Sequence, residues 1–295
     1  MELFLTVCVA SLTLGLLYVL FALGVALVLR ASGQVNLAHG DTLVLGTYVG
    51  VATAAAGAPP VAVLLAVVIS AVVSAVAYLG IYGPVQRRQR PGTLGLGFLP
   101  ALAVALLVRN LTEHLLPRGS RDVPPLLGAG TSHLFYDFRL PTSGWEILAA
   151  GVVVPLLLAR GLTRTRTGTR LRAVSDDPVL ARLSGIPVAR TLLLTFLVAG
   201  ALGGLAGALF ASFFGQLTVT LGWQATVKGF IVAVLGGVGR IRGVVAGGLG
   251  LGVLESFTSA YVTTTYRDVV TFALLIVVLL LVPRGLLAGG ALRDA

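Results

Sequence analysis

The sequence predicts an all-α, polytopic integral membrane protein whose 295 residues form one transmembrane domain, residues 1–295. Three observations predict this class: a mean hydropathy of +0.99, a hydrophobic content of 57% and a charged content of only 11%. A soluble domain of this length needs more polar surface than these residues supply. We therefore expect membrane lipid to replace water around most of the chain.

The first half of the chain contains enough apolar sequence for about five crossings, since a spanning helix needs about 20 residues. The run at 3–29 is too long for a typical signal peptide and lacks a basic start, so we expect it to remain in the mature protein. Pro59 and Pro60 divide the long run at 42–86 into two helices. The expected helices are 3–29, two within 42–86, 91–108, and 147–159 with Trp145 as an interfacial anchor.

The second half is interrupted more often. Residues 191–227 have room for one helix and part of the next, and 269–282 form a last hydrophobic helix. The runs 229–239 and 243–254 are shorter, and each either spans the membrane or re-enters it. The total is about eight or nine crossings, with broken or re-entrant segments in each half.

The arginines predict the orientation, because cytoplasmic loops of membrane proteins carry an excess of basic residues. The segment 109–140 between the two main clusters is nearly neutral and is expected as an outside loop. The C-terminal tail is expected in the cytoplasm, and the side of the N-terminus stays open. The clusters assigned to the cytoplasm are Arg87, Arg88 and Arg90, and then Arg160, Arg164, Arg166, Arg170, Arg172, Arg182 and Arg190.

The net charge of +10 does not indicate a nucleic-acid partner. The basic residues lie in short groups between apolar runs, which is typical of anchoring at an anionic lipid surface. The single cysteine, Cys8, offers no disulfide framework and no metal motif. We expect no nucleic acid, no metal and no cofactor bound by this chain.

A polar, glycine-containing segment at 30–41 lies between two long apolar runs. Broken helix at membrane depth is tolerated only where it is buried in protein or lines a water-filled cavity. The segment is therefore a candidate for the substrate pathway, or for shaping the break. The alternative is an ordinary interfacial loop with a helix cap at Asp41 or Thr42. The candidate pathway residues here are Gln34, Asn36, His39, Gly40 and Asp41.

A second glycine-rich break follows in the other half of the chain. Gly236, Gly237 and Gly239 interrupt an apolar stretch, and paired breaks of this kind point to a translocation site between structural repeats. The alternative is close helix packing through small residues, which is favoured for 247–252 and for the glycines at 200–207. No phosphate-binding GxxxxGK[ST] motif occurs, so the chain carries no such nucleotide site of its own.

A third segment, 170–186, is polar enough to leave the membrane on the cytoplasmic side. Leu171, Val174, Val179 and Leu183 give it a short amphipathic face, and Asp177 or a neighbour can cap a helix that begins near Pro178. Such an element needs a soluble partner on which to dock. The alternative is a solvated basic loop.

Four motifs in order resemble the branched-chain amino acid permeases of ABC importers of the LivH type. Residues 33–41 look like that family's "INFAHGE" element, and 168–186 resemble its cytoplasmic coupling segment. Residues 233–252 are similar to its "AVLGGIGSIPGAMIGG" region, and 259–270 to its ending. The departures, which put the exact substrate in doubt, are Leu37, Asp41, Arg240 and Arg242.

The resemblance implies a permease subunit of the bacterial inner membrane that pairs with a second, LivM-like permease. It also implies two ATPase subunits, which use the ATP, and an extracytoplasmic binding protein that supplies the substrate. Under this hypothesis residues 170–186 transmit the ATPase motion. The residues assigned to this coupling are Arg172, Ala173, Asp176, Asp177, Ala181 and Gly185.

Two charged residues remain within the apolar sequence of the second half. Lys228 and Glu255 are expected to face the interior, where they can form a pair. The absence of a chain of Asp, Glu and His argues against a proton-coupled carrier, although a stand-alone secondary transporter stays open as an alternative. Within the favoured class, urea and short amides are the rival substrates.

Overall fold

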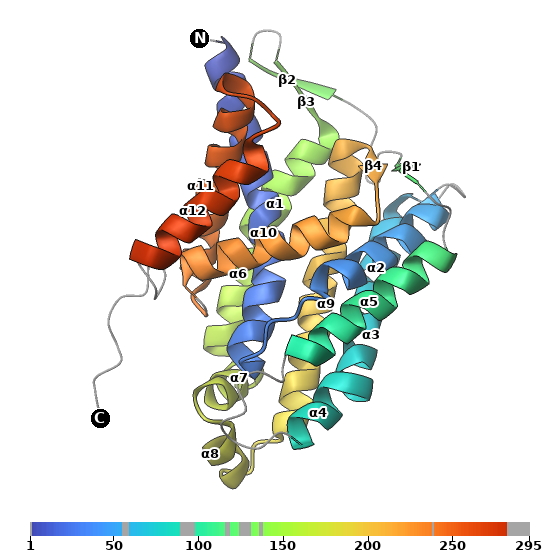
Figure 1. Ribbon diagram of the computed structural model, residues 1–295, viewed down its shortest axis with the longest axis vertical. Coiled ribbons are helices and arrows are strands. Elements are labelled where there is room, and N and C mark those ends of the chain that lie inside the picture. The colour runs from blue at the N-terminus through green and yellow to red at the C-terminus, as the bar shows by residue number, and fades with distance from the viewer. Residues whose placement is uncertain are drawn as a thin grey trace.

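The computed structural model describes residues 2–54, 59–88, 98–115, 119–123, 131–135, 138–237 and 239–281 (Figure 1). The described residues form an elongated helical bundle whose long helices run mostly along the long axis, with α10 lying across it. The expectation of an all-α membrane fold is confirmed. The only strands among the described residues are short extensions of the connections between helices.

The first half of the chain supplies the innermost helix and one side of the bundle. Its α3 continues through a π-helical turn, η1, into α4. The elements are α1 Glu2–Ser32, α2 His39–Ala54, α3 Pro59–Ala77, η1 Tyr78–Tyr82, α4 Gly83–Arg88, α5 Phe98–Leu115 and α6 Thr142–Arg164.

The second half supplies the projecting α7 and α8 and then four longer helices. These are α7 Arg166–Asp176, α8 Pro178–Leu183, α9 Val188–Phe214, α10 Thr220–Gly236, α11 Ile241–Tyr261 and α12 Arg267–Leu281. Two antiparallel pairs of strands complete the fold: β1 Arg121–Asp122 with β4 Gln216–Leu217, and β2 Thr131–Phe135 with β3 Phe138–Pro141.

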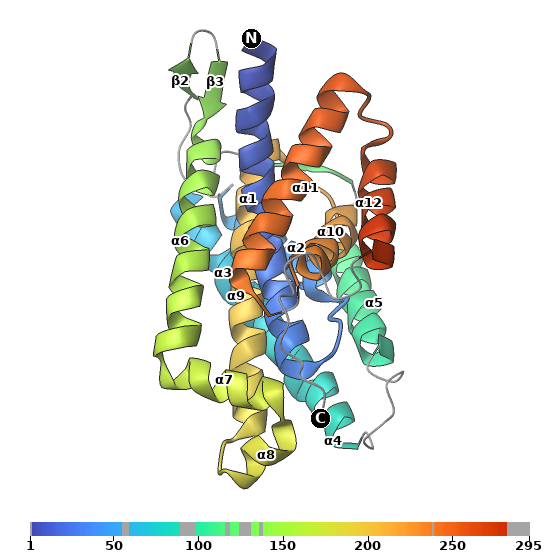
Figure 2. The same ribbon diagram turned by 90° about the vertical axis from the view of Figure 1, so that its left-hand side faces the viewer.

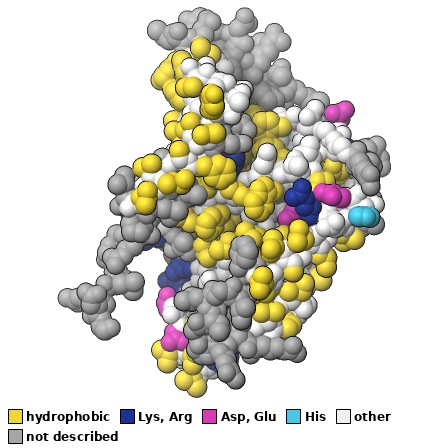
Figure 3. Space-filling model, in the orientation of Figure 1, with side chains coloured by type: hydrophobic (Ala, Val, Ile, Leu, Met, Phe, Trp, Pro, Cys, Tyr) yellow, Lys and Arg dark blue, Asp and Glu magenta, His cyan; other side chains and the backbone are white. Residues whose placement is uncertain are grey.

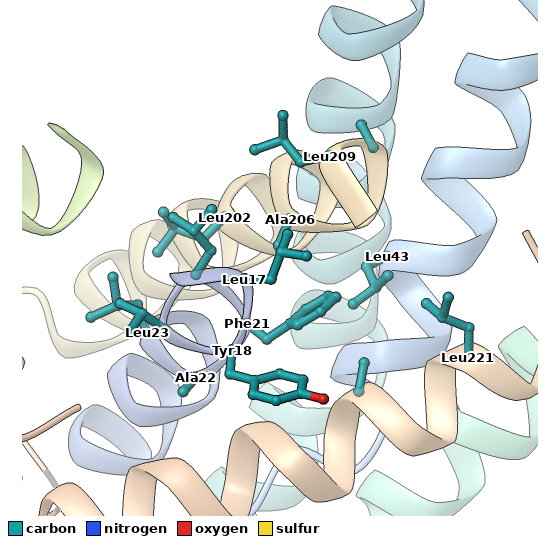
Figure 4. Packing of buried hydrophobic residues seen from close by; sticks show 14 of the residues in the cluster. Leu17, Tyr18, Phe21, Ala22, Leu23, Leu43, Leu202, Ala206, Leu209 and Leu221 are labelled. Carbon is teal, nitrogen blue, oxygen red and sulfur yellow. The ribbon is translucent and has the colours of Figure 1, made fainter. Parts of the chain in front are cut away.

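The core is built around α1, which packs against α6, α9, α10 and α11 (Figure 2). Leu17, Leu20 and Ala22 of α1 are completely buried. In Figure 4 the rings of Tyr18 and Phe21 point from α1 toward α10, while α9 covers another side of α1. A helix that is apolar all round is therefore surrounded by protein, and the lipid meets the outer helices instead.

Glycine lets the helices of this core approach closely. A Cβ atom on Gly252 of α11 would overlap the backbone of Gly15 in α1, and one on Gly204 of α9 would overlap the backbone of Ala66 in α3. These contacts confirm the packing interpretation of the glycines at 200–207 and of Gly248 and Gly252, whereas a Cβ on Gly250 meets nothing within 4 Å. Without a hydrophobic driving force in lipid, such close backbone contact is what holds helices together.

Several helix bounds differ from those that the sequence predicts. The helix predicted at 91–108 is α5, which extends to Leu115, and residues 91–97 lie outside the described part of the chain. The expected outside loop at 109–140 is therefore wrong at its start. Arg109 and Glu113 form an ion pair of 3.2 Å one helical turn apart, which stabilises the extra turns, and His114 lies in the helix rather than in a loop.

Five of the described helices are long and apolar enough to cross a membrane: α1, the α3 to α4 continuation, α6, α9 and α11. Helices α2, α5, α10 and α12 are outside this set. The total of about eight or nine crossings stays a prediction.

The predicted cytoplasmic elements gather at one end of the bundle. Figure 1 shows α4, α7 and α8 at the end opposite the N-terminus and the strand pairs. Helix α4 carries Arg87 and Arg88, whereas Arg90 and the C-terminal tail with Arg284 and Arg293 lie outside the described residues. The arrangement places the two arginine clusters at the same end, as their common assignment to one side of the membrane requires.

Candidate translocation site

The first predicted break lies between α1 and α2, at residues 33–38, and it is held by a buried asparagine. Asn36 is 3% exposed. Its Oδ1 accepts a hydrogen bond of 2.8 Å from the Tyr82 hydroxyl and one of 3.2 Å from the Ala38 backbone N–H. Gln34 Oε1 accepts a hydrogen bond from Gln86 Nε2 at 3.3 Å. The break is thus tied by side chains to η1 and α4, and the buried Asn36 carbonyl oxygen is satisfied within the protein.

The start of α2 rests directly on α10. The Gly40 N–H donates a hydrogen bond of 2.8 Å to Thr226 Oγ1. A Cβ atom at Gly40 would overlap the carbonyl oxygen of Gly222 on α10. Glycine is required here because the two backbones touch. Asp41 is 5% exposed and lies in the first turn of α2, where the helix dipole favours a negative charge.

His39 lies at the junction of three helices. Its ring is 1% exposed, and neither ring nitrogen has a hydrogen-bond partner among the described residues. The ring fits between Gly24 of α1 and Gly203 of α9: a Cβ on Gly24 would be 2.5 Å from Nε2, and one on Gly203 would be 3.2 Å from Cε1. The imidazole therefore occupies space that two glycines leave open.

The second predicted break joins α10 to α11 through residues with left-handed backbone. Gly237 and Gly239 have φ angles of 83° and 92°, which glycine adopts without strain. Gly236 packs against Gly243, and a Cβ on either would overlap the backbone of the other. The segment is a tight helix-to-helix turn, so close packing accounts for Gly236.

Arg30 connects the two breaks. It lies in the last turn of α1, just before the first break, and its Nη1 donates a hydrogen bond of 2.5 Å to the carbonyl oxygen of Gly239. In the sequence the two breaks are related only by their similar composition. In the structure they lie close together, and the hydrogen bond from Arg30 to Gly239 links them. Arg30 was not among the predicted site residues, although a basic residue at the end of a helix beside a glycine break is a recognisable signal.

A cavity of about 370 Å³ lies on another face of α10. Its walls come from α1, the end of α9, β4 and α10. The predicted pathway residues of the two breaks are not among the residues that line it. The lining residues are Leu14, Tyr18, Phe21, Phe210, Phe214, Gln216, Thr218, Leu221, Gln224, Ala225 and Lys228.

A buried polar network borders this cavity and confirms the expected pairing of Lys228 with Glu255. Lys228 Nζ lies 2.8 Å from Oε1 of Glu255, which is completely buried. The hydroxyl groups of Tyr18 and Thr271 donate to the same carboxylate at 2.5 and 2.9 Å. The ion pair joins α10 to α11, and the two hydrogen bonds add α1 and α12 to the network and satisfy the buried carboxylate.

Comparison with known proteins decides the class to which this helical bundle belongs. Residues 7–279 match the family described as "Branched-chain amino acid transport system / permease component". The chain belongs to this family of permeases. It is similar to the high-affinity branched-chain amino acid transport system permease protein LivH of Salmonella typhimurium, with 35% identity over 93% of this chain and 92% of that protein. It is also similar to BraD of Pseudomonas aeruginosa, with 32% identity over 95% of this chain and 94% of that one.

A solved structure shares the fold of this permease. The chain aligns with a chain of PsaBC from Streptococcus pneumoniae in complex with Fab, with a TM-score of 0.50. The alignment covers 96% of this chain and 93% of that chain at 12% sequence identity. The LivH-type resemblance and the multi-pass membrane fold are thus confirmed, and the family is one of transport proteins rather than enzymes.

The predicted coupling segment of the permease forms two helices, α7 and α8, that project beyond the bundle (Figures 1 and 2). Asp177 caps α8 by accepting hydrogen bonds from the N–H groups of Val179 and Leu180 at 2.7 and 2.9 Å. Asp176 is exposed, Arg172 and Ala173 are partly buried, and Gly185 ends the element with a φ of 78°. Ala181 is 3% exposed and faces the bundle.

The apolar residues of this segment divide into two faces. Leu171 and Val174 of α7 are buried against the bundle. Val179, Leu180 and Leu183 of α8 are 62%, 60% and 79% exposed. The single amphipathic face expected from the sequence is therefore wrong, because the bend at Asp177 turns the second half of the pattern away from the first.

Proposed function

We propose that this chain is the permease subunit of an ABC importer for branched-chain amino acids in a bacterial inner membrane. The observation that carries the proposal is the similarity to LivH over 93% of the chain at 35% identity. In this proposal the end with α4, α7 and α8 faces the cytoplasm, as does the C-terminus. The strand pairs and the N-terminus then face outward.

The proposed assembly contains a second, LivM-like permease, two ATPase subunits and an extracytoplasmic binding protein. ATP is hydrolysed by the partner subunits. The exposed apolar side chains of α8 support this arrangement, since three large hydrophobic residues on a projecting helix need a protein surface to cover them. Asp177 caps the start of this helix.

Transport by the reconstituted complex tests the proposal. Proteoliposomes that contain both permeases and the ATPases should take up radiolabelled leucine when ATP is inside and the binding protein is outside. Uptake of urea or a short amide instead of leucine would show that the rival substrate class is correct. Uptake without ATP and without partners would show a stand-alone transporter.

The coupling role of α7 and α8 has its own test. A disulfide or chemical cross-link from position 177 to an ATPase subunit should form in the assembled complex. Deletion of residues 176–183 should abolish ATP-driven uptake while the two permeases still associate. Unimpaired uptake after this deletion would contradict the role.

A further inference from the structure

The cavity beside α10 combines an apolar wall with a polar rim, which suits a small amphiphilic ligand. Phe21 and Phe210 have ring centroids 6.0 Å apart, and Phe210 and Phe214 have centroids 4.3 Å apart, so the three rings form a continuous surface. The cavity volume of about 370 Å³ lies in the range of small-molecule sites, about 300 to 1,000 Å³. Phe214, Gln216 and Gln224 are exposed at the mouth, so the cavity opens to the surface.

The cavity lining contains one member of the Lys228–Glu255 ion pair. Among the described residues that line the cavity, Lys228 alone carries a formal charge. Its partner Glu255 is 0% exposed and lies behind it, whereas the Lys228 side chain is 12% exposed. Lys228 Nζ also donates a hydrogen bond of 3.3 Å to the Tyr18 hydroxyl, so the ammonium group reaches the cavity as one end of a buried network. The pair as a whole is neutral, and Lys228 is its member in the cavity lining, so the positive end of the pair can attract the carboxylate end of a ligand.

The neutral polar groups of the cavity lining can pair with the ammonium group of a ligand. The side-chain amides of Gln216 and Gln224 offer carbonyl oxygens that accept hydrogen bonds, and so does the Thr218 hydroxyl. An ammonium group can donate to these acceptors while a carboxylate lies toward Lys228. The aromatic wall then faces the rest of the ligand, which has to be apolar.

From this arrangement we infer that the cavity between α1, the end of α9 and α10 is a binding site for the transported solute, a zwitterionic α-amino acid with an aliphatic side chain. The inference rests on the proposed function and adds the place at which this chain contacts the substrate. It assigns the contact to Lys228, Gln224 and the three phenylalanines, rather than to the packed residues of the α1 to α2 break.

A photoreactive leucine analogue with a diazirine in its side chain tests the site in the complete reconstituted transporter. Irradiation during turnover should label residues 210–228, and excess leucine should suppress the labelling. Ala225→Leu fills the cavity from α10 and should lower both labelling and uptake by about ten-fold, a loss typical of steric changes in small sites. Ala149→Leu is the matched control, because Ala149 is exposed on α6, away from the cavity.

A second variant keeps the test decisive if Ala225→Leu fails to assemble. Phe214→Ala enlarges the mouth and should raise uptake of phenylalanine relative to leucine, which a purely structural role would leave unchanged. Labelling confined to other segments, or an unchanged selectivity together with full uptake by Ala225→Leu, would overturn the site. If the wild-type complex takes up no leucine, the proposed function itself fails, and that result is distinct from a transporting complex with an inert cavity.

Discussion

The α1 to α2 break and the cavity lined by Lys228 lie on two faces of the same helix, α10. One face is closely packed against protein, and the other borders open space. Gly222 and Thr226 of α10 are packed against the start of α2. Gln224 and Lys228 of the same helix line the cavity. The break is closely packed, although its sequence is more polar than that of the segments that line the cavity. Polar, glycine-rich sequence at membrane depth therefore does not by itself locate an open path.

Charged side chains are few on the face of the molecule that Figure 3 shows. Hydrophobic side chains are spread over much of its described part, with a small group of charged side chains among them. The ion pair of Lys228 with Glu255 is different, because its carboxylate is completely buried. Buried charge is costly unless it is paired, so the cavity face of α10 should be the more sensitive of the two to loss of one partner.

The largest expected effect is therefore on the cavity side. Glu255→Leu leaves the Lys228 ammonium without its carboxylate and should destabilise the permease by about 3 to 5 kcal/mol. The melting temperature of the purified complex measures the loss. The double variant Lys228→Met/Glu255→Leu should recover most of it. A double variant as unstable as the single one would show that packing, not charge, dominates here.

The break side should respond next, through steric overlap. Gly40→Ala places a Cβ against the carbonyl oxygen of Gly222, and overpacking of this kind costs on the order of 3 kcal/mol. Thermal unfolding and the yield of assembled complex measure it. Gly250→Ala is the control, since a Cβ there meets nothing within 4 Å. Equal tolerance of both changes would mean that α2 and α10 do not touch as described.

A smaller effect should follow from the hydrogen bonds that close the break. Asn36→Ala leaves the Tyr82 hydroxyl and the Ala38 N–H unpaired and should cost about 1 to 3 kcal/mol. Tyr82→Phe removes one donor only and should cost about 1 kcal/mol. The two losses should not add, because both variants break the same bond. Full additivity in a double-mutant cycle would argue against this contact.

The smallest effect on stability should come from the projecting element. Leu183→Ala changes a side chain that is 79% exposed and should alter stability by less than about 0.5 kcal/mol. Uptake driven by ATP should nevertheless fall, because the substitution removes apolar surface from the proposed ATPase contact. Normal ATP-driven uptake by this variant would show that Leu183 of α8 is not needed for coupling to the ATPase.

Much of the fold could be predicted because hydropathy alone limits where helices can lie in a membrane. Pro59 begins α3, as its role as a turn residue predicts, and the arginines of α4 and α7 lie at one end. The end of α5 could not be predicted from hydropathy, because the turns after Val108 carry charged and polar residues, among them the exposed Arg109 to Glu113 pair. A helix can continue into charged sequence, whereas a prediction from apolar runs alone ends it at the last apolar residue.

The site could be predicted only in part, for a geometric reason. The pair Lys228 and Glu255 could be found because charge in an apolar run needs a partner. The aromatic wall could not be predicted, because Phe21 lies in α1 and Phe214 at the end of α9. These two residues line one cavity only because α1, α9 and α10 pack together in the folded protein. An isolated phenylalanine in an apolar helix gives no sign of such a role.

Two adjacent residues of α10 provide the most direct test of the contrast between its faces. In a background with Cys8→Ser, single cysteines replace Ala225, which lines the cavity, and Thr226, which contacts Gly40. A charged methanethiosulfonate reagent should modify the cysteine at 225 in the assembled complex, and leucine should slow the reaction, while the cysteine at 226 stays unmodified. Modification of 226 with 225 protected would contradict the account, because it would place the open path at the break.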